Sequence, residues 1–347
     1  MTAQASSAQR IRYYQEKEID MENIYEGKKV FVPGGSGMVG QALCERLREY
    51  GADVYVAGLD DESRAPKGTT YYKADLMDLN NCMELCEGMD YVFNMTGAKA
   101  SQITCRERPG TFFEHSVILA MNMLRAVRAK KVKRYMFTSS YSVYAPAEVF
   151  YEDEAFNALP SDNDWGNAWG KRVGELHVEA YRRELKLDNV CIVRPSSGFG
   201  PYDIFSEDGM IIPALIYRAV NGQNPLVVWG DGSAVRDIVY SKELARGMML
   251  LMEKMPDKPV NLGSGTGYSV REIAELVVKH VDPSIDLVFD TSKPTGDKKR
   301  VMSMERAASY GFHIEIPMDQ AIQETVDWYK ANREITSDRY DLFATKL

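Results

Sequence analysis

A glycine-rich turn placed between a short apolar run and a helical segment is the feature that most constrains the fold of this chain. The turn reads GGSGMVG from Gly34 to Gly40 and follows the apolar run Val30–Val32. A helical pattern covers residues 42–51, and a second apolar run begins at Asp53. Strand, turn, helix and strand in this order predict a βαβ unit with a right-handed crossover.

The same alternation of apolar runs and helical patterns continues to about residue 200. The sequence predicts helices over 79–88, 118–130 and around 171–183, and strands over 91–95, 134–140 and 190–195. Strands that alternate with helices form parallel sheets covered on both faces. The expected fold class is therefore α/β, a Rossmann-type doubly wound parallel sheet with a smaller C-terminal α/β lobe that binds substrate.

This pattern divides the chain into four segments. Residues 28–200 form the predicted dinucleotide-binding Rossmann domain, to which later segments return. Residues 201–330, where loops rich in Pro and Gly separate shorter elements, form mainly the substrate-binding lobe. Residues 1–27 are an N-terminal extension and residues 331–347 a C-terminal tail. The two ends either pack on a neighbouring subunit or are loose.

Composition excludes several classes of partner. The 347 residues carry a net charge of −8 and no run of Lys and Arg, which argues against nucleic acid. No apolar run approaches the ~18 residues of a membrane span, and the polar N-terminal residues do not form a signal peptide, so we predict a cytoplasmic protein. Five scattered cysteines are typical of reduced thiols, and four widely separated histidines indicate no metal site.

The spacing of the glycines predicts a dinucleotide site. In a GxxGxxG turn the backbone can approach a pyrophosphate closely, and the helix that follows points its N-terminus at the phosphate charge. The predicted contact residues are Gly34, Gly37, Met38, Val39 and Gly40.

The acid that would bind the adenosine ribose falls near the end of the second strand. The nearest acids are Asp60 and Asp61, with Arg64 just beyond. An acid favours NAD, whereas an arginine can accommodate the 2′-phosphate of NADP. We expect NAD with Asp60 as its ribose ligand, and NADP is not excluded. The alternative is that both acids are solvated turn residues.

An ordered series of short motifs resembles the extended short-chain dehydrogenase/reductase superfamily, the group of NAD-dependent nucleotide-sugar epimerases, dehydratases and reductases. The series comprises GGSGMVG, Asp75-Leu76, Gly97-Ala98-Lys99, Ser139-Ser140 with Val143-Tyr144, Lys171 with Glu175, Arg194-Pro195, Gly200-Pro201 and Trp229-Gly230-Asp231-Gly232 leading to Arg236-Asp237. The resemblance covers about residues 28–329. It implies a homodimer formed through two helices, one of them bearing Lys171.

The resemblance also implies roles for individual residues. Asp75 and Leu76 would contact the adenine, and Lys171 would bind the nicotinamide ribose. Gly97, Lys99 and Pro195 would also face the cofactor. Ser140 would hydrogen-bond the reacting hydroxyl of the substrate, and Ser197 would contact the substrate.

The C-terminal half narrows the resemblance to enzymes like GDP-L-fucose synthase, alongside those like UDP-galactose 4-epimerase. The similar segments are VVWGDGSAVRD (227–237) and DTSKPTGDKKR (290–300). A guanidinium can pair two hydrogen bonds with a phosphate, so Arg236 is the expected diphosphate ligand. Arg300 either joins it or lies in a solvated turn, and Trp229 either packs near the nucleotide or belongs to the core.

One position departs from the superfamily pattern. The general base of these enzymes is a tyrosine four residues before the lysine, where its pKa is lowered by the ammonium. This chain has Asn167 there, and an amide does not titrate in this range. Three explanations are open: another phenol, Tyr141, Tyr144 or Tyr202, takes the proton; the reaction is slow or relies on Ser140 and a lysine-held water; or the chain binds its ligands without turnover. Tyr144 has a second interpretation, simple packing on the cofactor.

Two further departures limit the reaction. Dehydratases of the superfamily have an Asp-Glu pair where this chain has Tyr141-Ser142, which argues against a dehydratase. GDP-L-fucose synthases use a cysteine and a histidine for epimerisation, and the matching positions here are Ser142 and Tyr202. We therefore expect NAD(P)-dependent oxidation, reduction or epimerisation at one carbon, C4, of a nucleoside diphosphate sugar, with a GDP-sugar favoured. The alternative is a catalytically impaired or non-catalytic binding protein.

Overall fold

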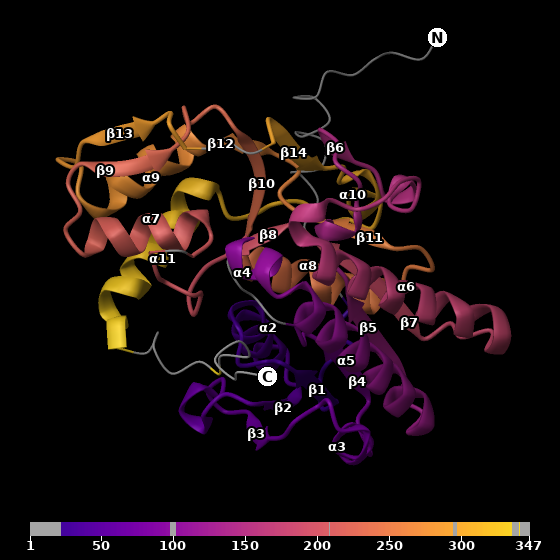
Figure 1. Ribbon diagram of the computed structural model, residues 1–347. Helices are drawn as coiled ribbons and strands as arrows, with labels where there is room; N and C mark the ends of the chain where they lie inside the picture. Colours follow the sequence, from indigo (N-terminus) through magenta and orange to yellow (C-terminus); the bar gives the residue numbers. More distant parts are fainter. Residues whose placement is uncertain (1–21, 98–101, 208, 294–296, 335–339, 341–347) are drawn as a thin grey trace, which may run out of the picture.

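A seven-stranded parallel sheet lies at the centre of the molecule (Figure 1). The computed structural model describes residues 22–97, 102–207, 209–293, 297–334 and 340. The strand order is β11-β7-β5-β4-β1-β2-β3. The strands are β1 (Lys29–Pro33), β2 (Asp53–Gly58), β3 (Thr70–Lys73), β4 (Tyr91–Asn94), β5 (Arg134–Thr138), β7 (Val190–Pro195) and β11 (Val260–Leu262). The predicted Rossmann-type doubly wound sheet is confirmed.

Helices cover both faces of this sheet. The helices α2 (Met38–Glu49) and α8 (Ser241–Lys254) pack on one face, and α3 (Leu79–Leu85), α5 (Pro109–Ala129) and α6 (Trp165–Leu185) pack on the other. Successive strand residues point to opposite faces, so Val30 and Val32 join the α2/α8 core whereas Phe31 joins the α5/α6 core. Because both faces are buried, the central strands are mostly apolar rather than alternating, whereas the edge strand β3 is largely exposed.

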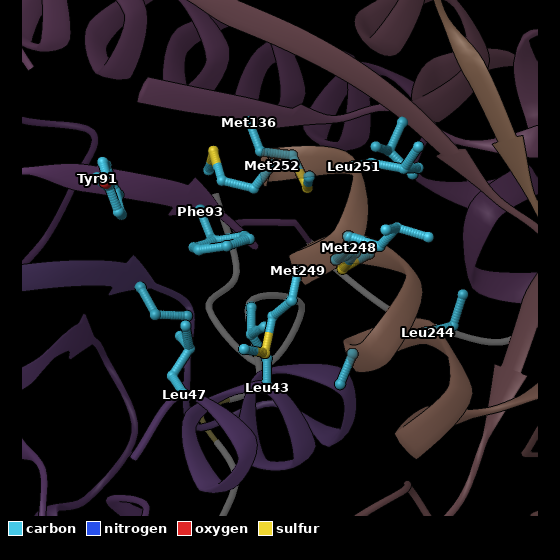
Figure 2. Close-up of a cluster of buried hydrophobic side chains, with 14 of the residues drawn as sticks. Leu43, Leu47, Tyr91, Phe93, Met136, Leu244, Met248, Met249, Leu251 and Met252 are labelled. Carbon is cyan, nitrogen blue, oxygen red and sulfur yellow. The ribbon is translucent and has the colours of Figure 1, made fainter. Parts of the chain in front are cut away.

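The core beneath α2 and α8 is rich in methionine (Figure 2). Leu43 and Leu47 of α2 meet Met248 and Met249 of α8, and the sheet contributes Phe93. Methionine side chains are flexible and fill irregular gaps, here between α8 and the sheet. This late segment of the chain thus packs on the seven-stranded sheet.

Tyr25 is anchored in the core beneath α2 and α8. It lies within the expected N-terminal extension, yet its side chain is fully buried in this same core, and its hydroxyl donates to the Met249 carbonyl at 2.6 Å. Its ring makes edge contacts with Tyr50 and Tyr91. A single aromatic ring with a satisfied hydroxyl anchors this segment, and the periodicity of the neighbouring residues gives no sign of it. Residues 1–21 lie outside the described part of the chain.

The C-terminal lobe is built from two small sheets and their helices. One sheet has the order β12-β10-β14-β6, with β8 paired to β10, and the other pairs β13 with β9. The strands are β6 (Val149–Phe150), β8 (Ser197–Phe199), β9 (Leu226–Trp229), β10 (Val235–Tyr240), β12 (Gly267–Ser269), β13 (Leu287–Asp290) and β14 (Lys299–Met302). The helices are α7 (Ile211–Val220), α9 (Val270–Val281), α10 (Glu305–Ser309) and α11 (Met318–Ala331), and α7, α9 and α11 enclose a separate apolar core.

The pairing of β6 with β14 brings segments from the two halves of the chain together. Val301 pairs with Val149 and Met302 with Phe150, while β14 also pairs with β10. A short strand that begins nine residues after Ser140 therefore joins the sheet of the C-terminal lobe. Among the described residues, no helix has the length and apolar character needed to cross a membrane.

Candidate active site

The glycine turn between β1 and α2 has the geometry of an anion cradle. Gly34 has φ +78°, and a Cβ there would lie 2.8 Å from the Met95 carbonyl oxygen. A Cβ on Gly40 would lie 2.5 Å from the Cα of Gly35. Gly37 has no side chain to cap α2, so the first turn of the helix keeps N–H donors for a ligand. These features fit a dinucleotide pyrophosphate.

Asp60 and Asp61 have different environments. Asp60 is buried and accepts a hydrogen bond from the Ser36 hydroxyl of the glycine turn at 2.6 Å, and its other carboxylate oxygen accepts the Tyr340 N–H at 2.8 Å. Asp61 is exposed and caps a short turn by accepting from the Ser63 N–H, which lowers the pKa of its carboxyl group. The solvated-turn interpretation therefore suits Asp61 but not Asp60.

The other predicted cofactor residues are spread along the carboxyl ends of the strands. Asp75 is exposed, whereas the Leu76 side chain belongs to the core under α3 and α5. Gly97 is exposed after β4, and Pro195 ends β7. The predicted residue Lys99 lies outside the described residues. Gly198, beside Ser197 on β8, packs against the Met38 and Val39 side chains of α2.

A buried ion pair fixes the helix that carries the predicted lysine. Arg194 on β7 donates from Nη2 to Glu175 Oε2 of α6 at 2.6 Å and from Nε to Oε1 at 2.9 Å, and both side chains are almost fully buried. The Ser139 hydroxyl, at the end of β5, also donates to Glu175. This bidentate pair joins β7, α6 and the turn after β5, residues 139–144, which is the active-site turn.

Tyr144 belongs to the same network, so it is not available as the base. Its hydroxyl donates to Asn261 Oδ1 at 2.6 Å and accepts from Arg194 Nη1 at 2.9 Å, and its ring stacks on Phe150. Burial raises the pKa of the phenol to about 12 despite the neighbouring guanidinium of Arg194. Tyr144 therefore holds Asn261 of β11 to the turn after Ser140.

Lys171 points to the ends of β4 and β5. Its Nζ donates to the Thr138 carbonyl at 2.8 Å and lies 3.4 Å from the Thr96 carbonyl. Burial lowers the pKa of the ammonium group to about 8, and the negative charge of Glu175 opposes this shift. Part of the Lys171 population is therefore neutral at slightly alkaline pH.

The residues around Asn167 form a polar turn. The Asn167 amide donates to the Ser142 hydroxyl at 3.2 Å, and the Ser140 Oγ accepts the Ser142 N–H at 3.1 Å. Because Ser140 uses its oxygen as an acceptor, its own O–H remains a donor for a ligand. Ser142 and Asn167, two of the residues that depart from the superfamily pattern, thus contact each other.

Tyr202 and Tyr141 lie in different surroundings. Tyr202 has φ +64° and packs its ring on Trp328 of α11, with the ring centroids 4.6 Å apart. Tyr141 follows Ser140 directly, and the Arg300 guanidinium lies 5.7 Å from its ring centroid. Of the three candidate phenols, Tyr141 therefore combines a place in the Ser140 turn with a contact to the C-terminal lobe.

Arg236 and Arg300 stand opposite each other on paired strands β10 and β14. Arg236 donates to the Asp297 carbonyl at 2.6 Å, and the Asp297 carboxylate lies 3.4 Å from Arg300 Nε. Like charges at opposed positions destabilise a sheet, and here one carboxylate partly offsets two cations. The pair is a local positive site in an acidic chain.

Trp229 is 57% exposed, with Lys293 Nζ 5.6 Å from its ring centroid, so it does not belong to the core.

The fold and the site together define a class of protein: a Rossmann enzyme of the short-chain dehydrogenase type that uses a nicotinamide dinucleotide. The strand order β3-β2-β1-β4-β5-β7 and the glycine turn after β1 are typical of dinucleotide-binding folds. The chain belongs to the NAD dependent epimerase/dehydratase family, whose family model matches residues 30–263.

Relatives in this family cover almost the whole chain. GDP-L-fucose synthase of Sinorhizobium fredii is 27% identical over 320 residues, which are 89% of this chain and 98% of that protein. GDP-L-fucose synthase 1 of Arabidopsis thaliana is 29% identical over 317 residues, 88% of this chain and 94% of that protein. The structure of an epimerase from Methanothermobacter thermautotrophicus has a TM-score of 0.81 at 23% identity, covering 90% of this chain and 95% of that one.

Removing the buried carboxylate should destabilise the protein. Glu175→Ala leaves Arg194 charged and unpaired in the core, so we expect the free energy of unfolding to fall by about 3–5 kcal/mol. Urea unfolding followed by circular dichroism measures it. Glu179→Ala, one turn along α6, breaks an exposed pair with Arg183 and should cost under about 1 kcal/mol. Equal losses in the two variants would contradict the structural role of the Glu175 pair.

Proposed function

We propose that the chain is an NAD(P)-dependent nucleotide-sugar reductase or epimerase that acts at C4 of the sugar. The observation that carries the proposal is the contact between the two halves of the site. Arg300 of β14, which faces Arg236, also lies over the ring of Tyr141, directly after Ser140. A diphosphate held by the arginine pair would therefore place its sugar beside the Ser140 turn.

Different residues would bind the cofactor, bind the substrate and exchange the proton. The glycine turn and Asp60 would hold the dinucleotide, which when bound exchanges a hydride with the sugar carbon. Lys171 would hold the nicotinamide ribose through its ammonium group. Ser140 would donate a hydrogen bond to the reacting oxygen, and the Tyr141 phenol would exchange its proton. Arg236, Arg300 and Ser197 would orient the substrate, with Trp229 beside the nucleotide base.

A GDP-sugar is the favoured substrate class. The relatives named GDP-L-fucose synthase support this choice, as do the two C-terminal segments that carry Trp229, Arg236 and Arg300. Ser142 stands where GDP-L-fucose synthases have the cysteine used for epimerisation. An unactivated serine is a poor acid or base for a proton on the carbon beside a ketone, which argues against a double epimerisation. The second candidate function, binding without turnover, is favoured by Asn167, which is engaged with Ser142.

Turnover with a panel of substrates separates these functions. The purified protein would be incubated with NADH or NADPH and the 4-keto forms, and with NAD⁺ or NADP⁺ and the 4-hydroxy forms, of GDP-, UDP-, dTDP- and CDP-sugars. We expect nicotinamide oxidation with a GDP-4-keto sugar, or a C4 epimer by chromatography with no net cofactor change. We also expect NADH to bind more tightly than NADPH, because the buried Asp60 carboxylate repels a 2′-phosphate. Binding of both ligands without any product would instead establish the non-catalytic function.

The arginine pair should control substrate affinity. Arg300→Ala removes charge-assisted hydrogen bonds to the diphosphate, so we expect KM for the nucleotide sugar to rise by about 10–100-fold with kcat little changed. Steady-state kinetics at fixed NADH measures both parameters. Lys299→Ala changes an exposed neighbour on the same strand and serves as the matched control. A comparable rise of KM in this control would refute a specific diphosphate contact.

Cofactor affinity should depend on the charge of Lys171. Since its pKa is lowered to about 8, the ammonium form predominates below that pH and is lost above it. Between pH 7 and pH 9 the charged fraction falls by about tenfold, and the dissociation constant for NADH should rise by the same factor. Fluorescence titration measures it. Lys171→Met should bind weakly with a flat pH dependence, and an unchanged slope in this variant would assign the titration to another group.

We also infer a homodimer formed through α5 and α6. The large side chains of Met121, Leu176 and Leu185 on these two helices are exposed. This arrangement agrees with the predicted pairing of the helix that bears Lys171 with a second copy.

A further inference from the structure

A buried carboxylate lies at the point where strand β10 changes its pairing partner. Arg236 of β10 is paired with Arg300 of β14. Ile238, two residues later on β10, is paired with Ser197 of β8. Asp237 is the residue between these two pairings, and only 6% of its surface is exposed. In Figure 1, β10 extends from the small sheet of the C-terminal lobe toward β8, so Asp237 stands at the junction of the two parts.

Five hydrogen bonds end on the Asp237 carboxylate. Its Oδ1 accepts from the Ser196 hydroxyl at 3.1 Å and from the Ser264 N–H and hydroxyl, both at 2.8 Å. Its Oδ2 accepts the Gly265 N–H at 3.1 Å and the Met302 N–H at 3.0 Å. A buried polar group without partners is costly, and here neutral donors from three separate segments satisfy both oxygens.

The loop after β11 is closely fitted to this carboxylate. A Cβ on Gly263 would lie 2.9 Å from each carboxylate oxygen of Asp237, so the loop reaches this position only because residue 263 is glycine. The two N–H donors that follow come from consecutive residues, Ser264 and Gly265. The loop therefore grips the carboxylate by its backbone.

The strands that carry the arginine pair are linked next to this carboxylate. Asp237 directly follows Arg236 on β10, and their side chains point to opposite faces because neighbouring strand residues alternate. On β14, the Met302 N–H that bonds the carboxylate lies two residues after Arg300. A shift of the carboxylate would therefore move the backbone on which both guanidinium groups are mounted.

The same carboxylate is linked to the cofactor side of the site. Ser196, whose hydroxyl donates to Asp237, lies between Pro195 at the end of β7 and Ser197 at the start of β8. Pro195 is a predicted cofactor contact and Ser197 a predicted substrate contact. One side chain thus joins the end of the Rossmann strand to the strands of the C-terminal lobe.

We propose that Asp237 is a positioning residue, which fixes the arginine pair relative to the cofactor-binding end of β7. The inference rests on the proposed function. A diphosphate held by Arg236 and Arg300 presents its sugar carbon to the nicotinamide only if both strands keep a set distance from β7. A misplacement of about 1 Å can cost about 100-fold in rate. Asp237 acts on the reaction through this distance, not by contact with the reacting atoms.

Replacing one carboxylate oxygen tests the proposal. Asp237→Asn keeps the size of the side chain but puts an NH₂ group where N–H donors point, so the strands must move apart. We expect the dissociation constant for a nucleoside diphosphate to rise by about tenfold or more and kcat to fall by about 100-fold. The glycine turn and Asp60 are unchanged, so NADH affinity should stay within about twofold.

The matched control is an aspartate with the same kind of hydrogen bonds on the surface. Asp282 is exposed at the end of α9 and accepts the Ser284 N–H at 2.9 Å and hydroxyl at 2.7 Å. Asp282→Asn should leave both affinities and kcat within about twofold of the parent. If Asp237→Asn does not fold, Ser264→Ala removes a single donor from the carboxylate, and about a threefold loss of diphosphate affinity is expected.

A mutant cycle separates positioning from general structural damage. Isothermal titration calorimetry would measure GDP, UDP, dTDP and CDP with the parent, and the tightest of them would be used throughout. In a protein already carrying Arg236→Ala and Arg300→Ala, adding Asp237→Asn should weaken binding by less than about twofold, because its effect passes through the arginines. The full tenfold loss in this background would overturn the proposal.

The remaining outcomes distinguish this inference from the proposed function. An active parent whose diphosphate affinity is unchanged by Asp237→Asn would overturn the positioning role and leave the proposed function intact. A parent that binds a diphosphate but turns over no nucleotide sugar would overturn the proposed function, and the affinity cycle would still decide the role of Asp237. A parent that binds none of the four diphosphates would overturn both.

Discussion

The ion pair between Arg194 and Glu175 is the interaction on which the rest of the site depends. It lies where a central strand, the α6 helix and the turn after β5 meet, and its remaining hydrogen bonds reach Tyr144 and Ser139. A buried pair of this kind is costly unless every polar atom finds a partner, and here the partners are the elements that present Ser140 and Lys171. The desolvation of two charges is thus offset by a network that fixes the relative positions of the site residues.

Much of the Rossmann half follows from the sequence because its signals are local. The turn from Gly34 to Gly40 is a close backbone approach that glycine permits, and the central parallel strands are mostly apolar, so a parallel sheet with covering helices can be predicted. Asp60 could also be found, because it follows the second strand at a short distance. In each case the residue and the structure that explains it lie close together in the chain.

The remaining features depend on contacts between distant segments. The burial of Tyr25 requires α8, and the hydrogen bond of the Tyr144 hydroxyl requires Asn261. Neither partner is marked by spacing or composition, so Tyr144 is among the phenols that the sequence offers as a base. Asn167 illustrates both limits. Its identity alone shows that the usual tyrosine is missing, whereas its hydrogen bond to Ser142 is known only from the fold.

The pairing of β6 with β14 has a consequence for the synthesis of the chain. The strand that follows the active-site turn finds its partner only in a segment near the C-terminal end. Chains emerge from the ribosome N-terminal end first, and contacts that are distant in sequence must wait for their second half. The nascent Rossmann sheet can assemble early, but the turn bearing Ser140 and Tyr141 gains its outer support only after the residues around Arg300 have been translated. A growing polypeptide therefore completes its reactive centre among its last steps.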